Sequence, residues 1–141
     1  MNIRAKGAGG ELEFCDWLFC KALVEVMPKR NLEQVRSGGI DVIPANHPFA
    51  YEVKRVENIT ELTLDRWWYK AVLDCSKHNK LNGEDREPIV AYRRNRGDWS
   101  FLLGVENLLG VSGTYAIVKA NVFVKYASRR IAGYMYGDSS S

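Results

Sequence analysis

The chain of 141 residues has little of what several common protein classes need. Its two histidines, His47 and His78, are far apart and belong to no motif, so a histidine-based zinc site, catalytic triad or HNH-type site is not expected. Its three cysteines, Cys15, Cys20 and Cys75, lack CxxC spacing, which predicts small buried thiols in a reducing compartment. No apolar run approaches a membrane span, and the N-terminus lacks the apolar core of a signal peptide. We therefore expect a cytoplasmic protein with no membrane partner.

What the chain does contain is the composition of one globular domain spanning residues 1–141. Hydrophobic residues make up 46% and charged residues 26%, both ordinary values for a folded domain that buries a core. The net charge of +3 permits a polyanionic partner without requiring one.

Two segments have the apolar periodicity of amphipathic helices. The first spans residues 9–27 and is ended by Pro28. Its apolar stripe comprises Cys15, Leu18, Phe19, Ala22, Leu23 and Val26. The second spans about 60–80, with Thr60 as its N-cap. Its inner face comprises Leu64, Trp67, Trp68, Ala71 and Cys75.

Strand-like runs lie around and beyond the second helix. They occupy 31–36, 40–44, 49–55, 89–94, 99–103 and part of 114–126, with a hairpin turn at 95–98. A short helix near 105–109 belongs to a C-terminal extension, 104–141, whose last residues, 137–141, are predicted to be flexible. The order of elements predicts an α/β domain with a central mixed β-sheet flanked by helices.

Three charged residues interrupt the apolar segment "GGIDVIPANHPFAYEVKR". Alternate strand residues face the same side, so Glu52 and Lys54 share one face of the strand 49–55. If 40–44 pairs with this strand, Asp41 can approach Glu52. Two converging carboxylates suit a hard divalent cation, and a neighbouring lysine can hold a water or stabilise charge on a phosphate. This combination fits phosphodiester hydrolysis.

The alternative is a surface ladder of cross-strand ion pairs, since E-x-K alone is common. The neighbours of the charges are nevertheless apolar and predict a largely buried sheet: Ile40, Val42, Ile43, Tyr51 and Val53. Buried carboxylates are costly unless something compensates their charge, and a metal ion would do so.

Two further residues could reach this site. Glu11 shares the helical side of Cys15 and Leu18, so it leans toward the core; alternatively, it only favours the helix dipole. Arg36 precedes Asp41 by five residues and could bind a phosphate through its planar fork, or lie solvated at a strand end.

Other basic residues fall into groups that would serve either as solvated faces or as a phosphate track. Candidate DNA contacts are Arg4 and Lys6 in a basic arm (1–10), Arg36, Arg55, Arg66 and Lys70, and Arg93, Arg94 and Arg96 near the hairpin turn. Binding along such a track should weaken with salt.

The motifs "RAKGAGGELE", "QVRSGGIDVI", "YEVKR" and "PIVAYRRNRGDWSFLL" together resemble the PD-(D/E)XK nuclease superfamily, specifically archaeal-type Holliday-junction resolvases and their phage-borne relatives. The resemblance covers about residues 4–103. It implies a restriction-endonuclease-like fold and a Mg²⁺-dependent endonuclease, with Mn²⁺ able to substitute. It also implies a homodimer that cuts four-way DNA junctions, in a bacterial, archaeal or phage-infected cell.

The resemblance also implies a role for each motif residue. Asp41 and Glu52 would bind the metal, with the Val53 carbonyl as a further ligand, and Lys54 would act at the attacking water. Glu11 corresponds to the glutamate of the first helix, and Arg36 to the arginine near the scissile phosphate.

Two departures and two alternatives stay open. Leu12 follows Glu11 where the family often has a basic residue, and Lys70 stands near the point where related nucleases often have glutamine. The alternatives are a nuclease of this fold acting on flap, fork or duplex DNA, and a non-catalytic DNA-binding module. The intact set of Asp41, Glu52 and Lys54 argues against the module.

Overall fold

The computed structural model describes residues 3–31 and 39–135, except for the side chains of residues 3–8 and 107. Its centre is a four-stranded sheet in the order β1-β2-β3-β4. The strands are β1 (Phe49–Arg55), β2 (Glu87–Arg93), β3 (Ser100–Gly104) and β4 (Tyr115–Lys119). β1 and β2 are parallel, while β2, β3 and β4 follow one another antiparallel, so the predicted mixed sheet and the hairpin are confirmed.

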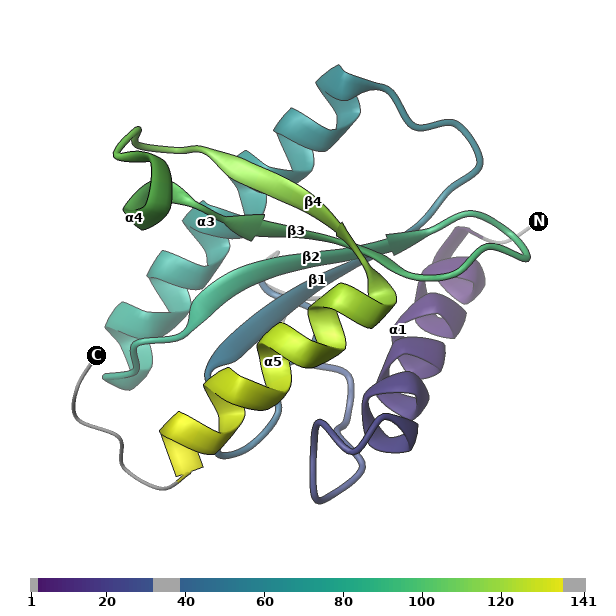
Figure 1. Ribbon diagram of the computed structural model, residues 1–141. Helices are drawn as coiled ribbons and strands as arrows, with labels where there is room; N and C mark the ends of the chain where they lie inside the picture. The colour runs from purple at the N-terminus through teal and green to yellow at the C-terminus, as the bar shows by residue number, and fades with distance from the viewer. Residues whose placement is uncertain (1–2, 32–38, 136–141) are drawn as a thin grey trace.

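Helices cover both faces of the sheet (Figure 1). They are α1 (Ile3–Cys20), α3 (Glu61–Asn82), α4 (Glu106–Leu109) and α5 (Ala120–Met135). α1 and α5 pack on one face and α3 packs on the other. α3 is the crossover that a parallel β1–β2 pair requires. Across the described ranges, we find no helix with the length and apolarity to cross a bilayer.

α3 matches the second predicted helix closely. Thr60 is its N-cap, and the Thr60 hydroxyl accepts the Thr63 N–H at 3.2 Å. At the other end Gly83 adopts φ 61°, the left-handed conformation that commonly ends a helix. On the inner face of α3, Leu64, Trp68 and Cys75 are buried, as the apolar spacing predicts.

The bounds of α1 correct the first predicted helix at both ends. It begins at Ile3 instead of residue 9 and ends at Cys20 instead of 27. Ala22 adopts φ 57°, its N–H bonds to the Phe19 carbonyl, and the Leu23 N–H bonds to the Leu18 carbonyl. These two hydrogen bonds are those of the helix ending that usually has glycine in the left-handed position. Here alanine takes that position, so no glycine in the sequence marks the end of the helix.

β1 separates an aromatic core from a charged face. Phe49, Tyr51 and Val53 point toward α1 and α5, into a core that includes Phe14 and Phe123. Ala50, Glu52 and Lys54 alternate with them and point to the α3 side. Because the period of a strand is two, one apolar face and one charged face follow directly from the sequence "FAYEVKR".

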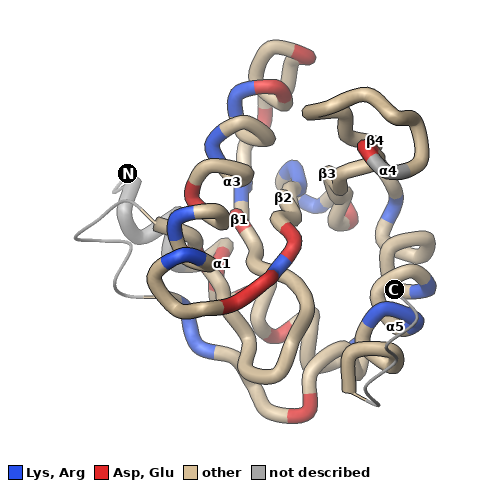
Figure 2. The backbone as a smooth tube through the Cα atoms, turned by 90° about the vertical axis from the view of Figure 1, so that its left-hand side faces the viewer, with Lys and Arg blue, Asp and Glu red and all other residues tan. Residues whose placement is uncertain are grey.

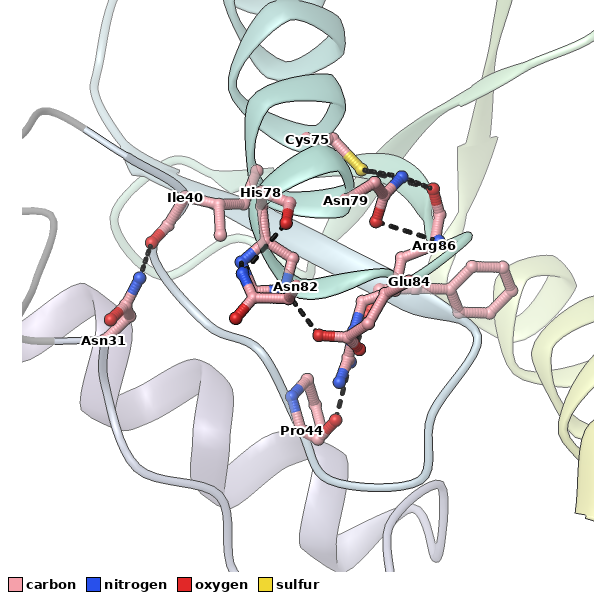
Figure 3. A network of polar contacts seen from close by, with 10 residues as sticks. Asn31, Ile40, Pro44, Cys75, His78, Asn79, Asn82, Glu84 and Arg86 are labelled. Atoms are coloured by element: carbon pink, nitrogen blue, oxygen red, sulfur yellow. Dashed lines mark hydrogen bonds and ion pairs between the residues drawn. The ribbon is translucent and has the colours of Figure 1, made fainter.

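The segment predicted as a strand at 40–44 lies beside β1 but forms isolated bridges instead of a strand. Val42 pairs with Tyr51 on one side and with Arg30 on the other, and the Tyr51 N–H donates to the Val42 carbonyl at 2.9 Å. Figure 3 shows what holds the segment at its two ends: the Asn31 amide donates to the Ile40 carbonyl at 2.9 Å, and the Arg86 guanidinium to the Pro44 carbonyl at 2.6 Å. Of the predicted strand at 31–36, only Asn31 belongs to the described residues, and the rest of it lies outside them.

The C-terminal part completes the sheet and then covers it. The short helix and the strand predicted after Gly104 are α4 and β4. The predicted strand region, however, changes to helix at Ala120, so α5 was not foreseen. Ala120, Phe123 and Ala127 of α5 are buried against the sheet, and Phe123 stacks on Phe101 with ring centroids 3.9 Å apart.

Candidate active site

Asp41 lies against β1 on the same side as Glu52. The Val53 backbone N–H donates to Asp41 Oδ2 at 2.8 Å, so this carboxylate is fixed next to the strand that carries Glu52 and Lys54. Asp41 is 6% exposed and Glu52 is 2% exposed. Asp41 and Glu52 are therefore both buried. The alternative of a solvent-exposed ladder of ion pairs does not apply to them.

Glu52 is flanked by two lysines, one at each carboxylate oxygen. Lys54 Nζ lies 3.6 Å from Oε2, and Lys70 Nζ of α3 lies 3.7 Å from Oε1. Both distances are ion-pair distances, and Oε1 is left buried without a hydrogen bond. Glu52 therefore has charge compensation, but an oxygen that can still accept a ligand.

Burial dominates the electrostatics of both carboxyl groups. Burial, and then the negative charge of Glu52, raises the pKa of Asp41 to about 7, although the Val53 N–H hydrogen bond opposes this. Burial also raises the pKa of Glu52, against the charges of Lys54 and Lys70. Because burial raises the pKa of both carboxyl groups, a cation bound at them would stabilise their ionised forms.

A divalent cation fits the donors that are present. Asp41 and Glu52 supply hard carboxylate oxygens, and the unbonded Glu52 Oε1 is a buried acceptor without a donor. Across residues 3–31 and 39–135, no three His, Cys, Asp or Glu side chains gather into a complete metal-binding cluster. Asp41 and Glu52 as metal ligands, with the Val53 carbonyl as a further ligand, stay a prediction.

Glu11 turns inward from α1, as the helical spacing predicts. It is 6% exposed, and its negative charge contributes to the raised pKa of Asp41. Arg30 donates from Nε to Glu11 Oε2 at 2.7 Å. Sequence reasoning missed Arg30, because nothing in the pattern of residues 28–31 marks it. A direct role of Glu11 as metal ligand stays a prediction.

Lys70 lies beside the site, where the resemblance expects a glutamine. Asp74, one helical turn later, accepts from Lys70 Nζ at 2.7 Å and is 8% exposed. Burial lowers the pKa of Lys70, but the hydrogen bond to Asp74 and the charge of Glu52 outweigh it, so its pKa is raised. Asp74 was missed, although the i,i+4 spacing of Lys70 and Asp74 was a signal for it.

Two predicted DNA contacts are engaged within the protein. Arg55 Nη1 pairs with Glu13 Oε1 at 2.9 Å, and Arg93 Nη2 with Glu13 Oε2 at 2.5 Å. Arg93 also stacks over the ring of Trp99. These arginines join α1 to the ends of β1 and β2, a structural role that sequence reasoning did not assign.

The other residues predicted to contact DNA, among those that the structure describes, are spread over the surface. Arg66, Arg94 and Arg96 are exposed, and Arg96 lies in the hairpin turn with φ 62°. Both basic and acidic positions are distributed along α3 (Figure 2). A role for these residues in DNA binding stays a prediction.

Three predicted residues cannot be placed by their side chains. Arg36 lies outside the described residues. Arg4 and Lys6 lie on the first turns of α1, where the backbone is helical, but their side chains are outside the described part.

A groove of about 970 Å³ lies next to the site on the α3 side of the sheet. Tyr92, the cross-strand neighbour of Lys54, is one of its lining residues, as are Thr60 at the start of α3 and Tyr115 of β4. Asp41 and Glu52 do not line it. The groove therefore adjoins the charged face of β1 without containing the carboxylates.

Comparison with protein families gives one match. A family described as "Phage putative PDDEXK endonuclease" matches residues 2–134, which includes β1 with its Glu52 and Lys54, and extends through α5. Comparisons with curated proteins and with solved structures gave no match. Nucleases of the PD-(D/E)XK superfamily generally use divalent metals, in agreement with the buried carboxylates. The chain therefore belongs to this phage PD-(D/E)XK endonuclease family.

Proposed function

We propose that this protein is a Mg²⁺-dependent endonuclease that cuts branched DNA, with four-way junctions as its preferred substrate. The observation that carries the nuclease assignment is the buried pair Asp41 and Glu52, with Lys54 beside it and Glu52 Oε1 left without a hydrogen bond. Two buried carboxylates cost free energy in a sheet that has only a structural role, whereas metal-assisted phosphodiester hydrolysis requires them.

Asp41 and Glu52 would hold the divalent cation. When bound, the cation supplies Lewis-acid stabilisation of the negative charge that develops on the phosphate and the leaving oxygen. Lys54 is positioned by Glu52 and only 30% exposed, so its ammonium orients the attacking water and stabilises charge on the phosphate. Arg36 is proposed to bind the scissile phosphate, and Glu11 to support Asp41 from α1.

The preference for junctions rests on the resemblance of the four sequence motifs to junction resolvases. Two-fold symmetric cutting of opposing strands would require a homodimer, which we include in the proposal. Salt should weaken junction binding, because basic residues would neutralise backbone phosphates.

Substrate preference is tested by cleavage of a four-way junction, a flap, a fork and a linear duplex that share one sequence. We expect the junction to be cut fastest, at paired positions in opposing strands. Faster cutting of the flap, fork or duplex would assign the site to another DNA substrate. Tight junction binding without cleavage in Mg²⁺ or Mn²⁺ would instead indicate a DNA-binding module.

A further inference from the structure

The two edges of the sheet differ in how they are covered. At the β1 edge, the segment 40–44 lies alongside, and Val42 and Tyr51 exchange two backbone hydrogen bonds. At the opposite edge, β4 pairs with β3, and within residues 3–31 and 39–135 no further strand pairs with β4 (Figure 1). Alternate residues of such an edge direct their backbone N–H and C=O groups away from the sheet, where another strand can pair with them.

β4 lacks the features with which edge strands usually prevent such pairing. Its register with β3 runs one to one from Tyr115 to Lys119, so it contains no bulge. It contains no proline, and its one charged residue, Lys119, is the last of the strand. Residues 107–118 carry no charge at all. The edge is therefore open to a strand of another chain.

The same uncharged segment exposes large apolar side chains. Those that are at least 55% exposed are Leu108, Leu109, Val111 and Ile117. The exposed apolar residues of α3 are interrupted by charge instead, since Arg66 lies between Leu62 and Tyr69. An uncharged apolar edge is unsuited to DNA, whose phosphates require cations, and it suits a protein partner.

We infer that the β4 edge is the interface of a homodimer, in which the β4 strands of two copies pair antiparallel about a two-fold axis at Ile117. The two sheets then form one sheet that continues across both chains. This inference rests on the homodimer that the proposed function includes and names the surface through which it forms. It can be tested without DNA or metal.

The sequence of β4 is complementary to itself in this register. Because opposing residues of a sheet point to the same face, Ile117 lies opposite its own copy and Tyr115 lies opposite the partner subunit's Lys119. Like charges placed directly opposite each other destabilise a strand pair. Here the two copies of Lys119 are four positions apart along the strands, roughly 14 Å at about 3.4 Å per residue. A second copy therefore pairs with the edge without opposing like charges.

Pairing at this edge also brings together the grooves of the two chains. Tyr115 and Ile117 of β4 both line the groove of about 970 Å³ on the α3 side of the sheet. A two-fold axis perpendicular to the sheet keeps the α3 sides of the two β4 strands on the same side, so the grooves meet at the axis. Each groove begins beside Lys54, whose cross-strand neighbour Tyr92 lines it. In the dimer, a groove thus leads from each charged face toward the axis.

Sedimentation velocity of the full chain over a range of protein concentrations measures the assembly. We expect the wild type to form a dimer. Ile117→Lys and Ile117→Glu each place like charges opposite each other at the axis, so each should raise the dissociation constant of the dimer at least about tenfold. Leu62→Lys is the matched control, because Leu62 is 59% exposed on α3 and Ile117 is 55% exposed. This control should assemble as the wild type does.

Mixing the two Ile117 variants separates a loss of pairing from a loss of structure. In an equimolar mixture of Ile117→Lys and Ile117→Glu, opposite charges meet at the axis, so the mixed dimer should form at least about tenfold more tightly than either variant alone. Chains that had lost their fold would not recover on mixing, and the circular dichroism of each variant should equal that of the wild type.

Three outcomes would overturn the inference: a monomeric wild type, a dimer that Ile117→Lys leaves intact, and a mixture that assembles no better than the single variants. A dimer with the expected response to both variants, but without cleavage of any DNA, would support the inference and overturn the proposed nuclease function alone.

Discussion

The two faces of β1 differ sharply in chemistry although they belong to the same seven residues. Toward α1 and α5, the strand presents Phe49, Tyr51 and Val53 to a dry aromatic core. Toward α3, it presents Glu52 and Lys54, with Asp41 fixed alongside by the Val53 N–H. One side is arranged to exclude water and the other holds charges that are expensive to bury.

The difference shows which face carries stability and which carries chemistry. Apolar burial is favourable in proportion to area, and stacked rings such as Phe101 and Phe123 add to it. Buried carboxyls with raised pKa values work against the folded state at neutral pH. The aromatic face thus stabilises the strand enough for it to display the charged face.

The largest expected effect comes from removing charge on the α3 side. Lys54→Ala and Asp41→Asn should each lower the rate of DNA cleavage by at least about 10³-fold, because water orientation or metal binding is lost. Junction binding should remain, as measured by gel mobility. Lys77→Ala serves as the control for loss of a lysine, and cleavage by Lys54→Ala at the wild-type rate would contradict the assignment.

Next in size is truncation on the aromatic side. Phe101→Ala removes one of the two stacked rings and should lower the free energy of unfolding by about 3–5 kcal/mol, measured by urea denaturation. The affinity of the folded fraction for Mn²⁺ should not change. Ile117→Ala on the edge strand β4, where the side chain is 55% exposed, should cost less than about 1 kcal/mol. Equal losses for the two variants would mean that the core is elsewhere.

The smallest expected effect links pH to stability through Asp41. Its folded pKa, about 7, exceeds the ordinary value of 3.8, so the folded protein binds this proton more tightly than the unfolded chain. The contribution of Asp41 to stability is therefore present below about pH 4 and is lost as pH rises through 7.

Thermal unfolding in a metal chelator at pH 8 measures this effect. Asp41→Asn cannot ionise, so it should melt at a higher temperature than the wild type under these conditions. Addition of Mg²⁺ should raise the melting temperature of the wild type more than that of the variant. A lower melting temperature for Asp41→Asn in chelator would show that repulsion at this site is not a cost to the fold.

The charged face could be predicted from the sequence because strand alternation depends only on the spacing of residues. "YEVKR" placed Glu52 and Lys54 together, and helical spacing turned Glu11 inward, where it is 6% exposed. The fold class followed from the order of helices and strands, and the family match agrees with it.

The parts that could not be predicted depend on contacts between distant segments. Arg30 reaches Glu11, and Arg55 and Arg93 share Glu13, through packing that no local pattern encodes. The first residues of α5, 120–126, fell inside the predicted strand region because Val and Phe favour strands, although Phe123 and Ala127 lie at helical spacing.

The end of α1 was missed for a local reason. Ala22 takes the left-handed conformation that usually requires glycine, so the only visible stop signal was Pro28, several residues later. Backbone conformations that depend on tertiary packing leave no mark on the residue type.

The most direct test of the account is cleavage of an end-labelled four-way junction by the wild-type protein, first in chelator and then with Mg²⁺. The account predicts intact junction in chelator. Once Mg²⁺ is added, it predicts nicked duplex products whose labelled strands end at defined positions. Intact junction under both conditions, from a folded protein that binds it, would contradict the claim that Asp41, Glu52 and Lys54 form a hydrolytic site.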